Sequence, residues 1–334
     1  MRVEEALTRI IGGVNLTAEE AERVMSNLML GEVHHGVIGG FLVGMQVKGV
    51  SGEELAGFAR GMRRQAVQFN FGVDNLVDTC GTGGGRATFN LSTGAAILAA
   101  ACGAKVAKHG NRAVTSKCGS ADVLEALGVP IEGNLEEQKK RLADTGLVFL
   151  YAPSHHPAVR HVAPVRKALG VRTYFNLLGP LANPAGAKRQ MIGVFDVRNL
   201  DVVAKALQIL GAEHAFVVHG QDGMDEVSPC AGTDYREVKG SEISAGVWQP
   251  SDFGMEALAP TDLDHGDGIA ENAEILKEAL TESRSVKSAA LIPNTAVTLV
   301  LAGVASSVSE GADLARAAVA SGEAGRLLDR LAAR

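Results

Sequence analysis

The chain of 334 residues is poor in aromatic side chains, since Phe, Tyr and Trp together make up only 4%. Proteins that bind single-stranded nucleic acid stack bases on exposed aromatic rings, so this scarcity argues against that class. An excess of positive charge is also absent: the formal net charge is −6, which does not favour DNA, RNA or an anionic membrane surface. We therefore expect no nucleic-acid and no membrane partner, and any anionic ligand must be held by local positive charge.

Cysteine is scarce as well. The four cysteines have neither the spacing of a metal site nor the density of a disulfide framework, which predicts reduced thiols: Cys80, Cys102, Cys118 and Cys230. The first ten residues, MRVEEALTRI, are charged and amphipathic and lack the apolar core of a signal peptide. These features predict a cytoplasmic protein.

One uncharged stretch, 288–309, is long enough to be compared with a membrane span. It contains Pro293, Asn294 and several Ser and Thr residues, and the sequence Pro-Asn-Thr is typical of a helix start. We therefore expect a buried core helix beginning near Pro293 rather than a span.

Glycine, in contrast, is abundant at 40 residues, which indicates many tight turns or a backbone that approaches a ligand closely. Residues 1–70 show only helical patterns. Thr17 and Ser51 are each followed three residues later by Glu, the signature of a capping box at a helix start. We expect a turn between these helices at His34-His35 and Gly39-Gly40.

After residue 76 the pattern changes to short apolar strands alternating with helices rich in Ala and Leu. Strands are expected at 76–80, 105–107, 147–151, 191–195 and 215–218, and helices at 93–102, 121–127 and 136–144. Such alternation predicts a mostly parallel central sheet covered on both faces. The fold class is thus α/β, with a small N-terminal α-helical domain, 1–70, and a large α/β domain, 71–334.

The first candidate site is a glycine loop, Asp78-Thr79-Cys80-Gly81-Thr82-Gly83-Gly84-Gly85-Arg86, which leads to Asn90, Ser92 and Thr93 at a helix start. Glycine backbone N–H groups and a helix N-terminus together bind anions. The dinucleotide fingerprint does not fit, because Arg86 stands where its third glycine belongs. A tight turn without a ligand remains an equal alternative.

The second candidate is the basic loop 108–120, KHGNRAVTSKCGS, which gathers Lys, Arg, His and hydroxyl side chains in an acidic protein. It follows a predicted strand and precedes a helix, where α/β folds bind ligands. Fixed charges and donors there suit a phosphate or pyrophosphate. The alternative is a solvated basic loop.

Two further clusters could bind metal. Asp222, Asp225 and Glu226 follow a predicted strand and are either solvated carboxylates or Mg²⁺ ligands beside a phosphate site. His155 and His156 have no third ligand at a suitable spacing, so zinc is not expected.

Read together, four stretches resemble the anthranilate phosphoribosyltransferase family. They are GTGG with NLST, KHGNRAVTSKCGSADVLEALGV, APSHHPAVRHVAPVRKALGVRTYFNLLGPLANP and VVHGQDGMDEVSP, within residues 78–229. The resemblance implies a nucleoside phosphorylase/phosphoribosyltransferase-like fold whose helical domain is completed by about 165–185 and forms a homodimer. Two related alternatives remain: a pyrimidine nucleoside phosphorylase-like enzyme and a non-catalytic nucleic-acid-binding relative.

The resemblance also implies an activity, the transfer of the phosphoribosyl group of phosphoribosyl pyrophosphate to the amine of anthranilate. The products would be N-(5-phosphoribosyl)anthranilate and pyrophosphate, in tryptophan biosynthesis, with Mg²⁺ as cofactor. The implied substrate-binding residues, most of them on the phosphoribosyl pyrophosphate side, are Gly81, Gly84, Gly85, Thr88, Asn90, Ser92, Thr93, Lys108, His109, Gly110, Asn111, Arg112, Ala113, Val114, Thr115, Ser116, Ser120 and Arg166.

The same resemblance places anthranilate against Asn111 and Arg166, with the Arg facing its carboxylate. Ser92, Asp225 and Glu226 are the implied Mg²⁺ ligands, and Lys108, Asn111 and Arg166 are the implied catalytic residues. His109 is either a general base or, as we expect, a residue that orients the loop or a substrate.

The glycine loop departs from the family pattern, in which Asp-Gly follows GTGG and two more residues precede Thr-Phe-Asn. Here Gly85-Arg86-Ala87 fills the gap one residue short, and the Asp is missing. Either the Asp is deleted, or Gly85 replaces it and the deletion falls later. We expect Arg86 to add positive charge nearby, and phosphoribosyl pyrophosphate to bind with a different Mg²⁺ optimum.

Overall fold

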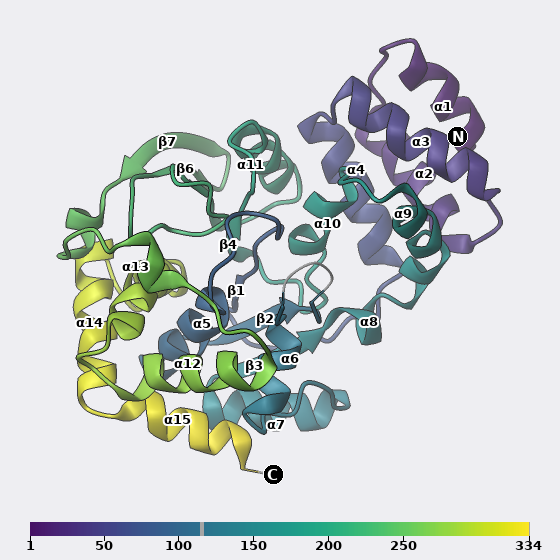
Figure 1. Ribbon diagram of the computed structural model, residues 1–334. Helices are drawn as coiled ribbons and strands as arrows, with labels where there is room; N and C mark the ends of the chain where they lie inside the picture. The colour runs from purple at the N-terminus through teal and green to yellow at the C-terminus, as the bar shows by residue number, and fades with distance from the viewer. Residues whose placement is uncertain (114–116, 334) are drawn as a thin grey trace.

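A computed structural model describes residues 1–113 and 117–333 as a helical part beside a larger α/β part (Figure 1). The helical part begins with α1 (Val3–Ile11), α2 (Ala18–Leu30), α3 (His35–Lys48) and α4 (Gly52–Arg64). The capping boxes are confirmed, since Thr17 accepts from the Glu20 backbone N–H and Ser51 from that of Glu54. These caps begin α2 and α4, whose contact is the most extensive between any two helices.

The turn predicted around 34–40 is wrong in its second half. His34 is the N-cap of α3, its ring nitrogen accepting from the Gly36 backbone N–H, and Gly39 and Gly40 lie inside the helix. A Cβ on Gly40 would lie 3.3 Å from a methyl carbon of Leu7 in α1. The glycine pair therefore permits close packing of α3 against its neighbours rather than a turn.

A mid-chain segment leaves the α/β part through α8 (Ala152–His155) and returns to the helical part as η1 (Pro157–His161), α9 (Ala163–Leu169) and α10 (Phe175–Leu181). Tyr174 packs its ring 4.7 Å from that of Phe58, and Val165 and Leu178 belong to the same apolar cluster as the N-terminal helices. Residues more than a hundred positions apart thus share one core.

The α/β part is built on a seven-stranded sheet in the order β3-β2-β1-β4-β5-β6-β7. The first five strands are parallel, as predicted: β1 (Val77–Thr79), β2 (Val106–Gly110), β3 (Leu147–Tyr151), β4 (Arg189–Gly193) and β5 (His214–Gly220). A hairpin of β6 (Thr233–Lys239) and β7 (Glu242–Trp248) adds two antiparallel strands that the sequence analysis missed. Most of its side chains are partly or fully exposed, so it lacks the apolar run of the other strands.

The helices of the α/β part are α5 (Leu91–Ala101), α6 (Ser120–Ala126), α7 (Leu135–Thr145), α11 (Asn199–Ile209), α12 (Ile269–Thr281), α13 (Val286–Ala302), α14 (Val308–Ala320) and α15 (Glu323–Ala332), with the short turns η2 (Pro250–Phe253) and η3 (Pro260–Leu263). The helices predicted at 93–102, 121–127 and 136–144 are confirmed as α5, α6 and α7. Asn134 caps α7 through a capping box.

The uncharged stretch 288–309 forms most of α13, a buried core helix as predicted, but the predicted start is wrong. Ser285 caps α13 by accepting from the Lys287 backbone N–H, so Pro293 lies inside the helix. No single described helix is long and apolar enough to cross a membrane, although α12 and α13, bent by 75° to each other, pass that test together by length and composition.

Candidate active site

The site lies at the carboxyl ends of the parallel strands. The chain leaves β1 toward β2 on one side and later adds β4 on the other, which creates a crevice between β1 and β4 of the kind that binds ligands in α/β folds. The glycine loop follows β1, the basic loop follows β2 and the acidic loop follows β5. A small cavity among them is lined by Thr79, Gly81, Ser92, Gly193, Asp225 and Glu226, with four further residues.

Lys108 places a buried positive charge beside this cavity. Its side chain is 3% exposed, and its Nζ donates to the Thr79 carbonyl at 2.5 Å and to Ser92 Oγ at 3.3 Å. Both acceptors belong to the elements around the glycine loop, so β2 delivers an ammonium group to the first candidate anion site. The structure therefore brings the two predicted loops together.

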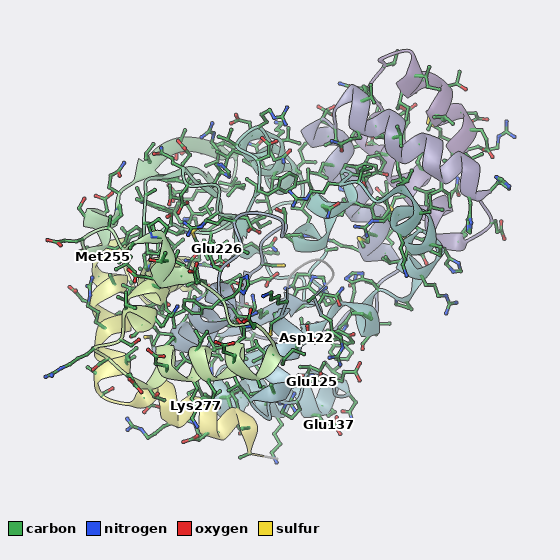
Figure 2. All side chains as sticks on the ribbon, in the orientation of Figure 1. Asp122, Glu125, Glu137, Glu226, Met255 and Lys277 are labelled. Atoms are coloured by element: carbon green, nitrogen blue, oxygen red, sulfur yellow. The ribbon has the colours of Figure 1, made fainter. Side chains whose placement is uncertain are left out.

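The acidic pair lies in the same place. Asp225 Oδ2 accepts from the Gly83 backbone N–H at 2.8 Å, and burial raises the pKa of Asp225. Burial, reinforced by the Asp225 carboxylate, raises the pKa of Glu226 to about 8, against the opposing effect of Lys108. Glu226 Oε2 is buried without a hydrogen-bond partner among the described residues. Figure 2 shows Glu226 inside the α/β part, away from Asp122 and Glu125 on α6.

The glycine loop needs its glycines because it packs directly on Asp225 and Arg172. A Cβ on Gly81 would lie 2.6 Å from Asp225 Oδ2, and one on Gly85 would lie 2.5 Å from Oδ1. Gly84 has φ +88°, and its Cβ would lie 2.4 Å from the Arg172 guanidinium carbon. A side chain at Gly81 or Gly85 would collide with Asp225, and the positive φ of Gly84 favours glycine there.

Arg86, which was expected to add positive charge near the loop, is paired with other groups. Its guanidinium donates to the Pro260 carbonyl at 2.8 Å and lies 3.9 Å from Asp222. In the shortened loop, Arg86 therefore ties the loop to η3 and to the acidic loop, and Asp222 offsets its charge.

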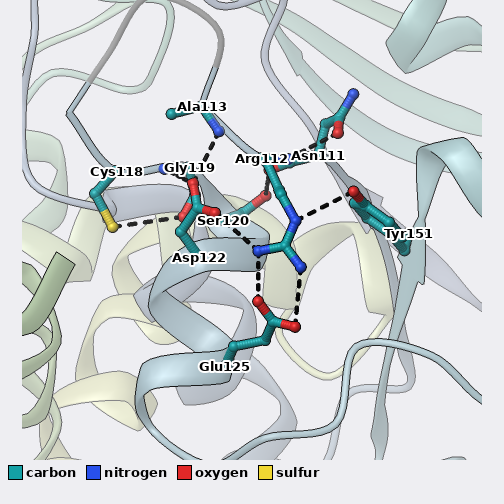
Figure 3. Close-up of polar contacts among 9 residues, drawn as sticks. All are labelled: Asn111, Arg112, Ala113, Cys118, Gly119, Ser120, Asp122, Glu125 and Tyr151. Atoms are coloured by element: carbon teal, nitrogen blue, oxygen red, sulfur yellow. Dashed lines mark hydrogen bonds and ion pairs between the residues drawn. The ribbon is translucent and has the colours of Figure 1, made fainter.

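The basic loop is turned toward α6 at Arg112 (Figure 3). The Arg112 guanidinium donates to Glu125 at 2.5 and 3.0 Å, to Asp122 at 3.1 Å and to the Tyr151 hydroxyl at 3.2 Å. Asp122 also accepts from the backbone N–H groups of Ala113 and Gly119, both at 2.9 Å. The two carboxylates thus offset the charge of Arg112. Its side chain points to α6 and not to the group of charges around Lys108.

The other residues of the basic loop are placed as follows. The Asn111 side chain accepts from the Arg112 backbone N–H at 2.7 Å, and its carbonyl accepts from Ser120 Oγ at 3.2 Å. Asn90 Nδ2 donates to the Cys118 carbonyl at 3.2 Å, which connects this loop to the start of α5. Gly110 ends β2. The predicted residues Val114, Thr115 and Ser116 lie outside the described residues.

His109 points away from Lys108, as successive residues of a strand must. Its Nδ1 lies 3.1 Å from the Gly179 carbonyl, an acceptor, so Nδ1 carries the proton. Burial, reinforced by His156, lowers the pKa of His109 to about 3. A neutral, buried ring of such low basicity suits the orienting role better than that of a general base. No group of three or more His, Cys, Asp or Glu with metal-site geometry occurs among residues 1–113 and 117–333.

Arg166 lies on α9, in the helical part of the molecule. Its guanidinium carbon is 5.2 Å from the centre of the Phe175 ring, and burial lowers its pKa. Within the described part of the chain no carboxylate pairs with it.

Thr93 Oγ1 is buried without a partner in the same set of residues, whereas Thr88 Oγ1 donates to the Phe89 carbonyl at 3.0 Å.

Sequence reasoning missed two residues of the site. Asn294 of α13 accepts from the Val227 N–H and donates to the Val227 carbonyl, both at 2.9 Å, which holds the acidic loop. The sequence did offer a signal for Asn294, because an amide side chain within a mostly apolar helix needs a buried hydrogen-bond partner. Arg172 lies against Gly84, and its sequence context alone offered no such signal.

Comparison with known proteins defines the class first. Residues 4–66 match the glycosyl transferase family, helical bundle domain, and residues 73–325 match the glycosyl transferase family, a/b domain. This protein is thus an enzyme of the glycosyl transferase class that pairs a helical bundle with an α/β domain.

Comparison with individual proteins identifies the family within this class. The chain is 46% identical to the anthranilate phosphoribosyltransferase of Caldanaerobacter subterraneus over 96% of its length and 94% of the relative's. The structure of the Thermus thermophilus anthranilate phosphoribosyltransferase superposes with a TM-score of 0.91 at 43% identity, covering 98% of each chain. The Saccharomyces cerevisiae enzyme in complex with PRPP and Mg gives 0.89 at 28% identity, covering 98% of this chain and 96% of that one. The chain belongs to the anthranilate phosphoribosyltransferase family.

Proposed function

We propose that this protein transfers the phosphoribosyl group of phosphoribosyl pyrophosphate to the amine of anthranilate, giving N-(5-phosphoribosyl)anthranilate and pyrophosphate in tryptophan biosynthesis. The observation that carries the proposal is the convergence of Lys108, the glycine loop and the acidic pair at the crevice between β1 and β4. The structure of a relative with PRPP and Mg, and of another complex with 4-fluoroanthranilate, supports the assignment of both substrates.

In this reaction the amine nitrogen of anthranilate forms a bond to the anomeric carbon of the ribose. The bond from that carbon to the pyrophosphate oxygen breaks, its electron pair leaves with pyrophosphate, and the amine loses a proton. An aromatic amine is already neutral at pH 7, so no strong base is needed, in keeping with the low pKa of His109. The work of the protein is to position both substrates and stabilise the departing anion.

Lys108 and the backbone N–H groups of the glycine loop hold the phosphates, with Asn90, Ser92 and Thr93 at the start of α5. Gly83 N–H now binds the Asp225 carboxylate, so an incoming anion competes for a donor that already binds one. The remaining members of this set are Gly81, Gly84, Gly85, Thr88, His109, Gly110, Asn111, Arg112, Ala113, Val114, Thr115, Ser116 and Ser120.

Arg166 pairs with the anthranilate carboxylate. A guanidinium over the Phe175 ring, with burial opposing its charge and no described carboxylate beside it, is stabilised when an aromatic acid places its carboxylate there.

Asp225, Glu226 and Ser92 fit a magnesium site. Burial raises the pKa of both carboxyl groups, and Asp225 raises that of Glu226 further. Glu226 Oε2 is also buried without a partner among the described residues, so a divalent cation there would compensate the buried negative charge. Mg²⁺ supplies charge compensation for the pyrophosphate oxygens when bound.

The helical part carries exposed apolar side chains suited to an interface with a second copy. Val43 and Val47 lie four residues apart on α3 and are 40% and 84% exposed, and Ile11 at the end of α1 is 73% exposed. We propose a homodimer through a helical domain of residues 1–70 completed by about 165–185, in the cytoplasm. Light scattering of the purified protein gives the oligomeric state, and a monomer at micromolar concentration would overturn the dimer.

The function is tested by mixing the protein with Mg²⁺, anthranilate and phosphoribosyl pyrophosphate and following the loss of anthranilate fluorescence. A parallel reaction with uridine or thymidine and inorganic phosphate tests the phosphorylase alternative. Fluorescence loss that needs all three components supports the proposal. Phosphorolysis of a nucleoside without fluorescence loss would place the protein with the alternative.

A further inference from the structure

Arg172 is an exposed, charged residue beside the glycine loop. It lies between α9 and α10, two residues after Gly170, the C-cap of α9. The residues that follow it are fixed: Thr173 is buried, and the Tyr174 ring packs 4.7 Å from Phe58. The helical part therefore anchors the backbone of Arg172, while its side chain extends to the α/β part.

The guanidinium fits between two features of the α/β part. Its carbon lies 2.4 Å from where a Cβ on Gly84 would be, so the guanidinium lies directly against the backbone of the glycine loop. On its other side it lies 4.7 Å from the centre of the Phe195 ring. Phe195 is itself tied to the glycine loop, because its N–H donates to Thr82 Oγ1 at 3.2 Å. The charge of Arg172 is thereby held at the edge of the loop.

No described carboxylate forms an ion pair with Arg172, and no described acceptor hydrogen-bonds it. The acid whose pKa it influences is Asp225, but that carboxylate accepts from Gly83 N–H. A guanidinium offers five N–H donors in a planar fork that matches two oxygens of a phosphate group. Arg172 therefore has donors to spare beside a loop whose N–H groups also bind anions.

We propose that Arg172 binds the pyrophosphate group of phosphoribosyl pyrophosphate from the helical side of the crevice. This inference rests on the proposed function and deepens it. Two arginines then divide the two anions of the reaction: Arg166, packed over Phe175, takes the aromatic carboxylate, and Arg172, against Gly84, takes the pyrophosphate. Because Arg172 belongs to the helical part, bound pyrophosphate links the two parts of the molecule.

The test is calorimetric titration of the full chain with inorganic pyrophosphate and Mg²⁺, in the absence of anthranilate. Arg172→Gln removes the charge, Arg172→Lys keeps it without the fork, and Arg284→Gln changes an exposed arginine in the turn between α12 and α13. We expect Arg172→Gln to bind pyrophosphate at least about tenfold more weakly, equivalent to about 1.4 kcal/mol. Arg172→Lys should recover part of the loss, and Arg284→Gln should match the unsubstituted chain.

Steady-state kinetics distinguish a role in binding pyrophosphate from a role in packing alone. Arg172→Gln should raise the KM for phosphoribosyl pyrophosphate and leave that for anthranilate within about twofold. Unchanged pyrophosphate affinity in Arg172→Gln, with or without a lower Tm, overturns the proposal, as does an effect confined to anthranilate. If pyrophosphate binding depends on Arg172 but the unsubstituted protein consumes no anthranilate, the binding role stands and the proposed function fails.

Discussion

At the scale of single residues, the site combines a buried cation with buried acids that need it. Lys108 opposes the pKa increase of Glu226, while Asp225 reinforces it, so the charges of these three groups are interdependent. Removing one partner of such a set leaves the others buried and uncompensated. The sequence predicted that these three residues belong to the site. Their protonation depends on how deeply each is buried, and a sequence motif does not show burial.

Replacing both acids tests the metal site. Asp225→Asn with Glu226→Gln keeps side-chain size and removes two charges that hold Mg²⁺, so activity should fall at least about tenfold, or about 1.4 kcal/mol, and more Mg²⁺ should be needed. Asp74→Asn, an exposed acid before β1, is the control. Near-normal turnover of the double variant at low Mg²⁺ would show instead that both residues are solvated loop carboxylates without a metal.

Arg166→Ala tests the acceptor site. Losing the guanidinium should raise the KM for anthranilate much more than that for phosphoribosyl pyrophosphate, because only anthranilate presents a carboxylate to it. Lys167→Ala, an exposed neighbour on α9, should change neither constant. Equal effects of Arg166→Ala on both substrates would remove Arg166 from the acceptor site.

The pKa of His109 has a consequence for stability. Since it is lowered from 6.5 to about 3, the unfolded state binds more protons than the folded state between these pH values. The free energy of unfolding should therefore rise with pH up to about 6.5, by at most roughly 1.4 kcal/mol per pH unit from this group. Urea unfolding at pH 5 and pH 7 should show a smaller pH effect in His109→Gln, and an unchanged effect would contradict the burial argument.

At the scale of elements, the loops after β1, β2 and β5 meet because parallel strands end at one edge of the sheet. This convergence was predictable from strand–loop–helix order, and the helices α5 to α7 were predicted from caps and apolar spacing. The β6–β7 hairpin was not, since its exposed strands carry no apolar run, nor was the interior position of Pro293 in α13. The directions of Arg86 and Arg112 depend on partners from other elements, Asp222 and Glu125, which sequence spacing does not reveal.

The shortened glycine loop offers a prediction at this scale. Inserting Asp after Gly84 adds a carboxylate near Asp225 and the phosphates, which should shift the Mg²⁺ concentration of maximal activity. Inserting Asn at the same point controls for loop length. Superimposable Mg²⁺ titrations of the natural and Asp-inserted chains would show that the loop change has no electrostatic effect.

At the scale of the whole molecule, Arg172 reaches the crevice from the helical part, and the acidic pair with Lys108 lies on its α/β side. Arg166 and Arg172 come from the segment that shares its core with the N-terminal helices. Sequence patterns alone predicted a helical region followed by an α/β region. They did not predict that a mid-chain segment packs with the N-terminal helices and contributes residues to the site. That arrangement depends on packing between distant residues such as Tyr174 and Phe58.

The central claim is that this crevice joins anthranilate to phosphoribosyl pyrophosphate. The most direct measurement follows both products of one reaction, anthranilate loss by fluorescence and pyrophosphate release by a coupled enzymatic assay, with Mg²⁺ present. The account predicts one pyrophosphate released for each anthranilate consumed, and neither change when either substrate is left out. Pyrophosphate released without anthranilate consumption, or no reaction at any Mg²⁺ concentration, would contradict it.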